Sequence, residues 1–334
     1  MISVVTTIFP PTDSLKKFSE IQTEPNRIIV IGDKKGPDEF ELRNCEFYSL
    51  ESQTQMPFKL AGLLPYGHYS RKNLGYLIAV RLGNDCIYET DDDNCPNQFW
   101  GPREKTIRAL IAEKSTWINI YNHFTKEKIW PRGFLLDRLV KIDSFPLHNG
   151  LLVEFESPLQ QGLADVSPDV DAIWRLTQDR EFYFERKESI ALPAGSWCPF
   201  NTQSTWWWRE AFPLLYLPSF CSFRMTDIWK SFVAQRCLWE MGYMVVFHAP
   251  EVNQQRNYHN LMKDFEAEIP GYTKNELLTQ TLENTALLPG KENALRNLVV
   301  CYEALISKGL LPSEEMPLVR AWAEDVERLL YKVN

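Results

Sequence analysis

Apolar and polar positions over the first ninety residues follow two alternating patterns. Continuous apolar runs rich in Ile and Val, at residues 2–9 and 27–33, predict two buried strands. Apolar residues three or four apart predict helices over 14–21 and 71–83, and a further short run predicts a strand over 85–89. This order of strands and helices is typical of an α/β fold with a parallel sheet. Ligands bind to such sheets beyond the carboxyl ends of the strands.

The remainder of the chain divides into two stretches that differ in composition and in hydrophobic pattern. Residues 95–225 are irregular and rich in Pro, Trp and Phe, which predicts loops, short strands and much of an acceptor pocket. A helix over 226–241 and a strand over 243–247 follow. From about residue 272 the pattern predicts three helices, over 274–288, 291–311 and 313–333. We therefore predict a main α/β domain over 1–270 and an all-α extension over 271–334.

Composition and charge narrow the class of protein. The 334 residues are 44% hydrophobic and 24% charged, as in an ordinary globular protein, and the net charge of −8 argues against a general nucleic-acid binder. The seven cysteines form no CxxC pair and no zinc spacing, which indicates free thiols and a reducing compartment. The sequence shows neither a signal peptide nor an apolar run of membrane-spanning length. The prediction is a cytoplasmic protein, with room for a peripheral membrane contact.

Three consecutive aspartates, Asp91, Asp92 and Asp93, follow the strand predicted over 85–89. Side chains alternate along an extended segment, so Asp91 and Asp93 share one face. Two carboxylates on one face are a hard-oxygen site for Mg²⁺ or Mn²⁺, which takes few protein carboxylates and completes its shell with phosphate oxygens. The alternative is a solvated acidic turn.

Charged residues at two further element ends are candidates for a nucleotide. Asp33 ends the second strand, where its carboxylate would accept a hydrogen bond from a base such as uracil; the alternative is a charged turn. Arg71 and Lys72 begin a helix, where cations are unfavourable unless an anion such as phosphate binds beside them. The alternative there is a solvated first turn.

Three more features carry both a functional and a structural interpretation. Asp227, in the first turn of its helix, would be a general base or would simply stabilise the helix end. His248 follows a strand and would be a third metal ligand, a phosphate contact or a structural residue. The tryptophans 206–208 would stack on a sugar ring or belong to the core.

Several segments together resemble one known family. The stretches "PYGHYSRKNLGYLIAVRLGNDCIYETDDDN", "WPRG", "QQGLADVSPDVDAIW" and "FRMTDIWKSFVAQRCLWEMGYMVVFHAP" are similar, in this order, to the STELLO glycosyltransferase-like family over roughly residues 1–265. That family in turn resembles the plant reversibly glycosylated polypeptides, which act as UDP-arabinopyranose mutases. The resemblance implies a GT-A (Rossmann-like) nucleotide-sugar domain, whose DXD-type acidic turn binds a divalent metal and diphosphate. The helices after about residue 272 lie outside the resemblance.

The resemblance also implies roles for single residues. Asp227 falls on the catalytic base of inverting members, and Asp91, Asp92 and Asp93 fall on the acidic motif. Together with the position of His248 at the end of a strand, this makes Asp91, Asp93 and His248 the expected metal ligands. The residues expected to bind the nucleotide sugar are Thr6, Thr7, Asp33, Arg71, Lys72, Asp91 and Asp92. Lys72 replaces the arginine that becomes glycosylated in the mutases, a departure that disfavours mutase activity.

The function expected from the sequence is a glycosyltransferase that depends on Mn²⁺ or Mg²⁺. It would move a sugar from a nucleotide-diphosphate donor, expected to be a UDP-sugar, to a hydroxyl of a glycan or lipid-linked acceptor, as in polysaccharide biosynthesis. Asp227 would remove the acceptor proton and give inversion. The alternatives are a nucleotide-sugar pyranose/furanose mutase and a non-catalytic glycosyltransferase-like scaffold. The C-terminal helices leave room for a homo-oligomer.

Overall fold

The computed structural model describes residues 1–23, 25–139, 144–255 and 260–331. It confirms the predicted α/β class. The strands are β1 Ile2–Thr7, β2 Arg27–Gly32, β3 Cys45–Tyr48, β4 Cys86–Thr90, β5 Asn94–Pro96, β6 Thr106–Ile111, β7 Val153–Glu156, β8 Leu159–Asp165, β9 Ile190–Leu192, β10 Ser204–Trp208 and β11 Val245–Gln254. The α-helices are α1 Asp13–Ile21, α2 Leu50–Thr54, α3 Lys72–Arg81, α4 Tyr121–Phe124, α5 Ala172–Gln178, α6 Thr226–Glu240, α7 Leu261–Glu283, α8 Ala294–Ser307 and α9 Glu315–Leu330.

One mixed sheet organises the described residues, in the order β3-β2-β1-β4-β10-β8-β11-β9-β6-β7, with β5 paired to β11. The first four strands are parallel, as the sequence predicts, and β10 is antiparallel to both of its neighbours. Val4 and Ile29 pack into the larger core cluster with α3, whereas Val5 and Val30 pack with Phe18 of α1 on the other face. Burial on both faces explains why these strands are continuous apolar runs in the sequence.

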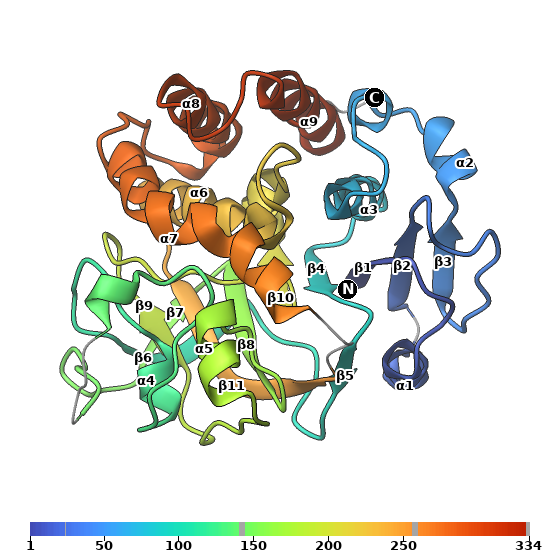
Figure 1. The fold of residues 1–334 in the computed structure, drawn as a ribbon. Coiled ribbons are helices and arrows are strands. Elements are labelled where there is room, and N and C mark those ends of the chain that lie inside the picture. The colour runs from blue at the N-terminus through green and yellow to red at the C-terminus, as the bar shows by residue number, and fades with distance from the viewer. Residues whose placement is uncertain (24, 140–143, 256–259, 332–334) are drawn as a thin grey trace.

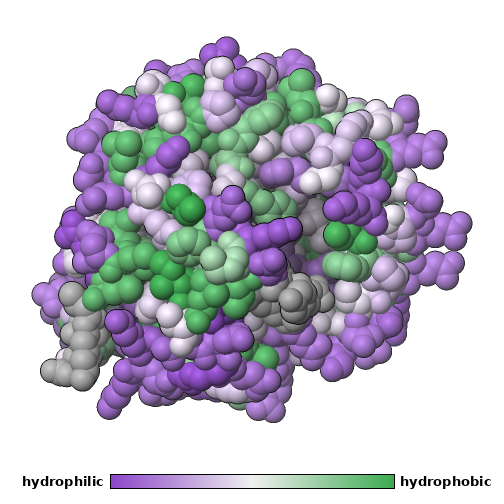
Figure 2. Space-filling model, viewed as in Figure 1, coloured by the Kyte–Doolittle hydropathy of each residue, from purple (hydrophilic) through white to green (hydrophobic). Residues whose placement is uncertain are grey.

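The helices cover the sheet unequally. Figure 1 shows α3 and α1 on opposite sides of the N-terminal strands, with α6, α7, α8 and α9 gathered on the side of α3. Leu298 and Cys301 of α8 and Trp322 of α9 are buried in the same core cluster as the residues of α3 and α6. Hydrophilic side chains dominate the periphery of this face, and hydrophobic ones gather in patches nearer its middle (Figure 2). No helix of the described residues combines the length and the apolar character needed to cross a bilayer.

The first of the C-terminal helices begins earlier than the sequence predicts. Helix α7 starts at Leu261, with Asn260 as its N-cap, and continues through Pro270 to Glu283. Gly271 lies so close to the Met225 sulfur that a Cβ atom would collide with it. The predicted division at residues 270 and 271 falls inside this helix and stays a prediction. The last two residues of the helix predicted over 313–333 lie outside the described residues.

Candidate functional site

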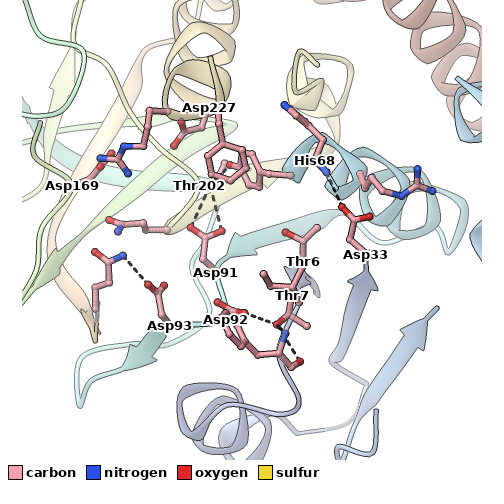
Figure 3. A pocket seen from close by; sticks show the side chains of 18 of the residues that line it. Thr6, Thr7, Asp33, His68, Asp91, Asp92, Asp93, Asp169, Thr202 and Asp227 are labelled. Atoms are coloured by element: carbon pink, nitrogen blue, oxygen red, sulfur yellow. Dashed lines mark hydrogen bonds between the residues drawn. The ribbon is translucent and has the colours of Figure 1, made fainter. Parts of the chain in front are cut away.

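A cavity of about 580 Å³ lies beyond the carboxyl ends of β1, β2 and β4. It brings together eight residues singled out by the sequence: Thr6, Thr7, Asp33, Arg71, Asp91, Asp92, Asp93 and Asp227. Figure 3 shows Asp33 and His68 at one end, Asp169 and Asp227 at the other, and the three aspartates after β4 between them. The site is therefore elongated, with chemically different ends.

The three aspartates after β4 point to different neighbours. Asp91 accepts hydrogen bonds from the Lys72 ammonium, 2.9 Å from Oδ1, and lies 3.5 Å from the Thr202 hydroxyl. Asp92 accepts from the Thr7 hydroxyl at 2.5 Å. Asp93 accepts from the Gln254 amide at 3.0 Å. The sequence prediction that Asp91 and Asp93 share a face treats this segment as a strand, but β4 ends at Thr90 and the aspartates form a turn.

Burial, and to a smaller extent neighbouring acids, disfavours the charged forms of these carboxyl groups. Burial, followed by the neighbouring Asp91 and Asp92, raises the pKa of Asp93 to about 7. Burial likewise raises the pKa values of Asp91 and Asp92 above the usual range, although Lys72 opposes this for Asp91 and Thr7 for Asp92. A cation placed beside this turn would therefore relieve a repulsion that the fold itself creates. Within the ranges described, no group of three or more His, Cys, Asp or Glu side chains could by itself hold a metal ion.

The end of the cavity near Asp33 is built from backbone donors. Asp33 accepts from the N–H groups of Gly67 and His68, each at 2.8 Å, and from its neighbour Lys34 at 2.7 Å. These bonds join the end of β2 to the loop before α3 and fix the orientation of the carboxylate. A carboxylate has about four acceptor positions, so one position remains for a ligand.

Arg71 and Lys72 occupy different positions although they are adjacent in sequence. Arg71 lines the cavity, and its guanidinium donates to Gln53 at 2.7 Å and to the Leu64 carbonyl. Lys72 does not line the cavity: its ammonium is fully buried and donates to the Thr90 carbonyl at 2.6 Å and to Asp91. Lys72 therefore acts on the site through Asp91.

Arg132 joins two carboxylates at the far end of the cavity. Its guanidinium contacts both oxygens of Asp227, at 3.0 and 2.7 Å, and both oxygens of Asp169, at 2.8 and 3.0 Å. The three side chains are no more than 9% exposed. Burial alone would raise the pKa of Asp169, but the Arg132 charge lowers it below its usual value. One buried guanidinium thus holds two carboxyl groups side by side, and removal of this cation would leave both of them without a charged partner.

A second buried ion pair sets the position of α6 relative to β4. Glu89, just before the acidic turn, accepts from the Lys230 ammonium at 2.9 and 2.7 Å and from the Trp207 indole at 2.9 Å. Lys230 lies one turn after Asp227 on α6. The same pair thus links the strand that carries Asp91 to the helix that carries Asp227. Trp206 and Trp207 are fully buried, so these two tryptophans belong to the core and do not face a sugar ligand.

His248 does not reach the cavity. Its ring nitrogens lie 2.7 Å from the Ser189 hydroxyl and 3.0 Å from the Gln160 amide oxygen, inside the sheet. Burial, followed by the charge of Arg103, holds its pKa well below the usual value. The structure thus gives His248 two hydrogen-bond partners of its own and separates it from the three aspartates. We do not retain it as a metal ligand.

Sequence reasoning missed several residues of the cavity. Arg132, Asp169, Thr202, Phe223 and Gln254 line it without having been assigned a role. The signal for three of them was present, because Arg132 lies in "WPRG", Asp169 in "SPDVD" and Phe223 at the start of "FRMTDIW", all within the segments that carried the family resemblance. Nothing in the sequence indicated that these segments meet.

The mixed α/β fold with an acidic turn after a central strand is that of a GT-A-like glycosyltransferase domain. Residues 224–334 match the family model "STELLO glycosyltransferases". Two Arabidopsis thaliana proteins, "Probable glycosyltransferase STELLO2" and "Probable glycosyltransferase STELLO1", are each 28% identical to this chain, over 274 and 267 residues. The resemblance of this chain to the STELLO glycosyltransferase family is therefore confirmed.

The extent of these matches shows how much of each protein is shared, and it corrects the expected C-terminal boundary of the resemblance. They cover 75% and 73% of this chain but 35% and 34% of the two relatives, so the chain spans about a third of their length. The expectation that the resemblance ends near residue 265 is wrong, because the family model includes α7, α8 and α9. These helices are part of what the family shares, in agreement with their burial against α3 and α6.

Proposed function

We propose that this chain is a metal-dependent glycosyltransferase that uses a UDP-linked sugar and a hydroxyl acceptor on a glycan or lipid-linked glycan. The observation that carries the proposal is the convergence of eight sequence-selected residues, from five separate parts of the chain, on one elongated cavity. The acidic turn lies between an end suited to a nucleotide base and an end with paired carboxylates (Figure 3). A donor that spans the cavity would place its diphosphate beside the acidic turn.

The acidic turn fits a divalent cation shared with a diphosphate. Mg²⁺ and Mn²⁺ in such sites need only one or two protein carboxylates, and Asp91 and Asp93 are the residues that would hold the ion. When bound, the cation neutralises charge on the leaving diphosphate. Lys72 holds Asp91 in place through its buried ammonium, and Arg71 lines the cavity as a second positive charge.

Asp227 is the proposed base at the acceptor end. One oxygen accepts from Arg132 and from the Ile228 N–H, and the other accepts from Arg132 alone. The second oxygen therefore has an acceptor position left for the hydroxyl of the incoming sugar. Arg132 keeps the carboxylate pointing into the cavity. Removal of the hydroxyl proton opposite the leaving diphosphate would give inversion.

The geometry does not favour the mutase alternative. In the related mutases a side chain at the position of Lys72 would carry the sugar, whereas the Lys72 ammonium is fully buried and paired with Asp91. A sugar could not be attached there without breaking this pair.

Asp93→Asn is expected to change two measured quantities in opposite directions: the stability of the protein without metal, and the stabilisation that its ligands provide. Because the pKa of Asp93 is raised to about 7, its charge destabilises the fold at higher pH, and the amide should raise or maintain the melting temperature of the protein without metal at about pH 8. The same variant should lose the extra stabilisation that UDP and Mn²⁺ give the wild type, about 2.7 kcal/mol at a hundredfold excess over the dissociation constant. Thermal unfolding with and without both ligands measures the two effects.

Asp38→Asn, at an exposed position in the turn after β2, is the matched control and should keep the ligand-induced shift. Full UDP and Mn²⁺ stabilisation of the Asp93→Asn variant would contradict the proposed metal site.

The Asp33 end of the cavity predicts selectivity for the base. UDP should bind more tightly than ADP or GDP by on the order of ten- to a hundredfold, because a hydrogen bond to a charged group contributes about 1.5–3 kcal/mol. Asp33→Asn should reduce this preference, since an amide cannot both accept the Gly67 and His68 N–H groups and present an acceptor to the base. Calorimetric titration of the three nucleotides with Mg²⁺ gives the ratios. Equal affinities for the wild type would remove Asp33 from the base site.

A further inference from the structure

Phe223 is an exposed aromatic side chain inside the cavity. It lies on the short 3₁₀ segment Phe223–Met225, one turn before Asp227, and it lines the same cavity while remaining 57% exposed. Large apolar side chains at such positions contribute little to the fold, since their burial is incomplete. An aromatic ring presented to a polar cavity indicates a ligand with an apolar face.

Two neighbouring rings hold Phe223 in a defined orientation. The ring of His68 meets it edge-on with centroids 6.0 Å apart, and the ring of Tyr69 lies 5.8 Å away at a tilt of 56°. Tyr69 is itself anchored by its hydroxyl, 2.5 Å from the Thr202 hydroxyl. Phe223 is thus supported on one side by the loop before α3, and the exposed part of its surface is available to a ligand.

Two arginines near Phe223, Arg224 and Arg132, are already paired with carboxylates. Arg224 contacts buried Glu268 at 2.9 and 2.7 Å, and Arg132 contacts both Asp169 and Asp227. A sugar ring has one face of C–H groups, which can pack against an aromatic ring, and an edge of hydroxyls, which can form hydrogen bonds with paired ionic groups. At Arg224 and Arg132 an acidic sugar would instead have to displace a carboxylate from the arginine.

We infer that Phe223 is the platform of an acceptor subsite, against which a neutral sugar ring packs with its hydroxyl edge towards Asp227. The inference rests on the proposed function and adds the position and the charge class of the acceptor. Phe223 is then a specificity-determining residue for the acceptor, and its contact with His68 places it between Asp227 and the end of the cavity that holds Asp33.

Saturation-transfer NMR with the wild-type protein, UDP and Mg²⁺ tests the subsite. The probes are neutral β-linked tetrasaccharides of glucose, xylose and mannose, and an acidic tetrasaccharide of galacturonate. At least one neutral probe is expected to show transfer to its ring C–H protons. Binding of none of the neutral probes, or stronger binding of the acidic one, would overturn the inference.

Variants then assign the binding to Phe223. Phe223→Ala should weaken the bound tetrasaccharide about tenfold, and Phe223→Trp should keep it within a few fold, because loss of an aromatic contact of this size is worth about a factor of ten. Phe220→Ala is the matched control, since Phe220 is 40% exposed but does not line the cavity. An unchanged affinity in Phe223→Ala would overturn the assignment.

UDP affinity separates this inference from the proposed function. If wild-type protein binds UDP but no neutral sugar, only the acceptor subsite fails; if it does not bind UDP, the proposed function fails.

Discussion

Replacement of Asp227 by Asn is expected to lower the rate of sugar transfer by about 10²–10⁴-fold, the usual contribution of one general base. The amide keeps the size of the side chain but cannot take the acceptor proton. Donor binding should persist, because Asp227 lies at the end of the cavity away from Asp33 (Figure 3). The measurements are UDP release from a panel of UDP-sugars in the presence of neutral oligosaccharides, together with the affinity for UDP and Mn²⁺.

Asp325→Asn provides the control for loss of a buried, arginine-paired aspartate. Asp325 is 1% exposed, contacts Arg328 at 3.1 Å and accepts the N–H groups of Lys59 and Leu60, but it does not line the cavity. Both variants should lose stability, and only Asp227→Asn should lose transfer. Near-normal transfer by Asp227→Asn at a lowered melting temperature would show that Asp227 serves the ion pair and the helix end alone. The proposed mechanism would then lack its base.

Arg132→Met is expected to cause the largest loss of stability, about 3–5 kcal/mol, the usual cost of removing one partner from a buried ion pair. Here one substitution leaves both Asp169 and Asp227 without their cation. Arg132→Lys should recover part of the loss but not all, because an ammonium cannot contact two carboxylates through both oxygens of each. Denaturant unfolding at about pH 7 and about pH 3 measures the effect on either side of the usual carboxyl pKa.

The loss should depend on pH in a defined direction. Arg132 lowers the pKa of Asp169 in the wild type, so the stability that this ion pair contributes is present above the usual carboxyl pKa of about 4 and disappears below it. The deficit of Arg132→Met should therefore be greatest near neutral pH and shrink on acidification. Arg138→Met is the matched control: Arg138 is 54% exposed and pairs with the half-exposed Glu276, so its loss should cost no more than about 1 kcal/mol. An equal loss in the two variants would contradict the bridging role of Arg132.

The sequence by itself determined the parts of this protein that depend on local pattern. The runs of Ile and Val in β1 and β2 specify strands that are buried on both faces. The helical spacing of α3 then specifies the helix that connects these strands to β4, so that Asp33 and Asp91 follow parallel strands at one edge of the sheet. Parallel strands bring their carboxyl ends to the same edge, so this half of the cavity follows from connectivity. The family resemblance added Asp227, which no local pattern distinguishes from a helix-stabilising acid.

The tertiary structure alone decided which residues of the irregular middle meet this edge. Arg132 and Asp169 are 37 residues apart, and Asp227 is 95 residues from Arg132; no periodicity relates them, because loop residues are placed by long-range packing and not by backbone repeats. Lys72 and Arg71 show the converse, because they are adjacent in sequence but their side chains point to different places. The start of α3 directs the Lys72 side chain to Asp91 in the acidic turn and the Arg71 side chain to the cavity. His248 is a further example, because the packing around β11 buries its ring between Gln160 and Ser189, which hold it by hydrogen bonds. Which face of an element looks into a cavity is set by its packing partners, and these lie far away along the chain.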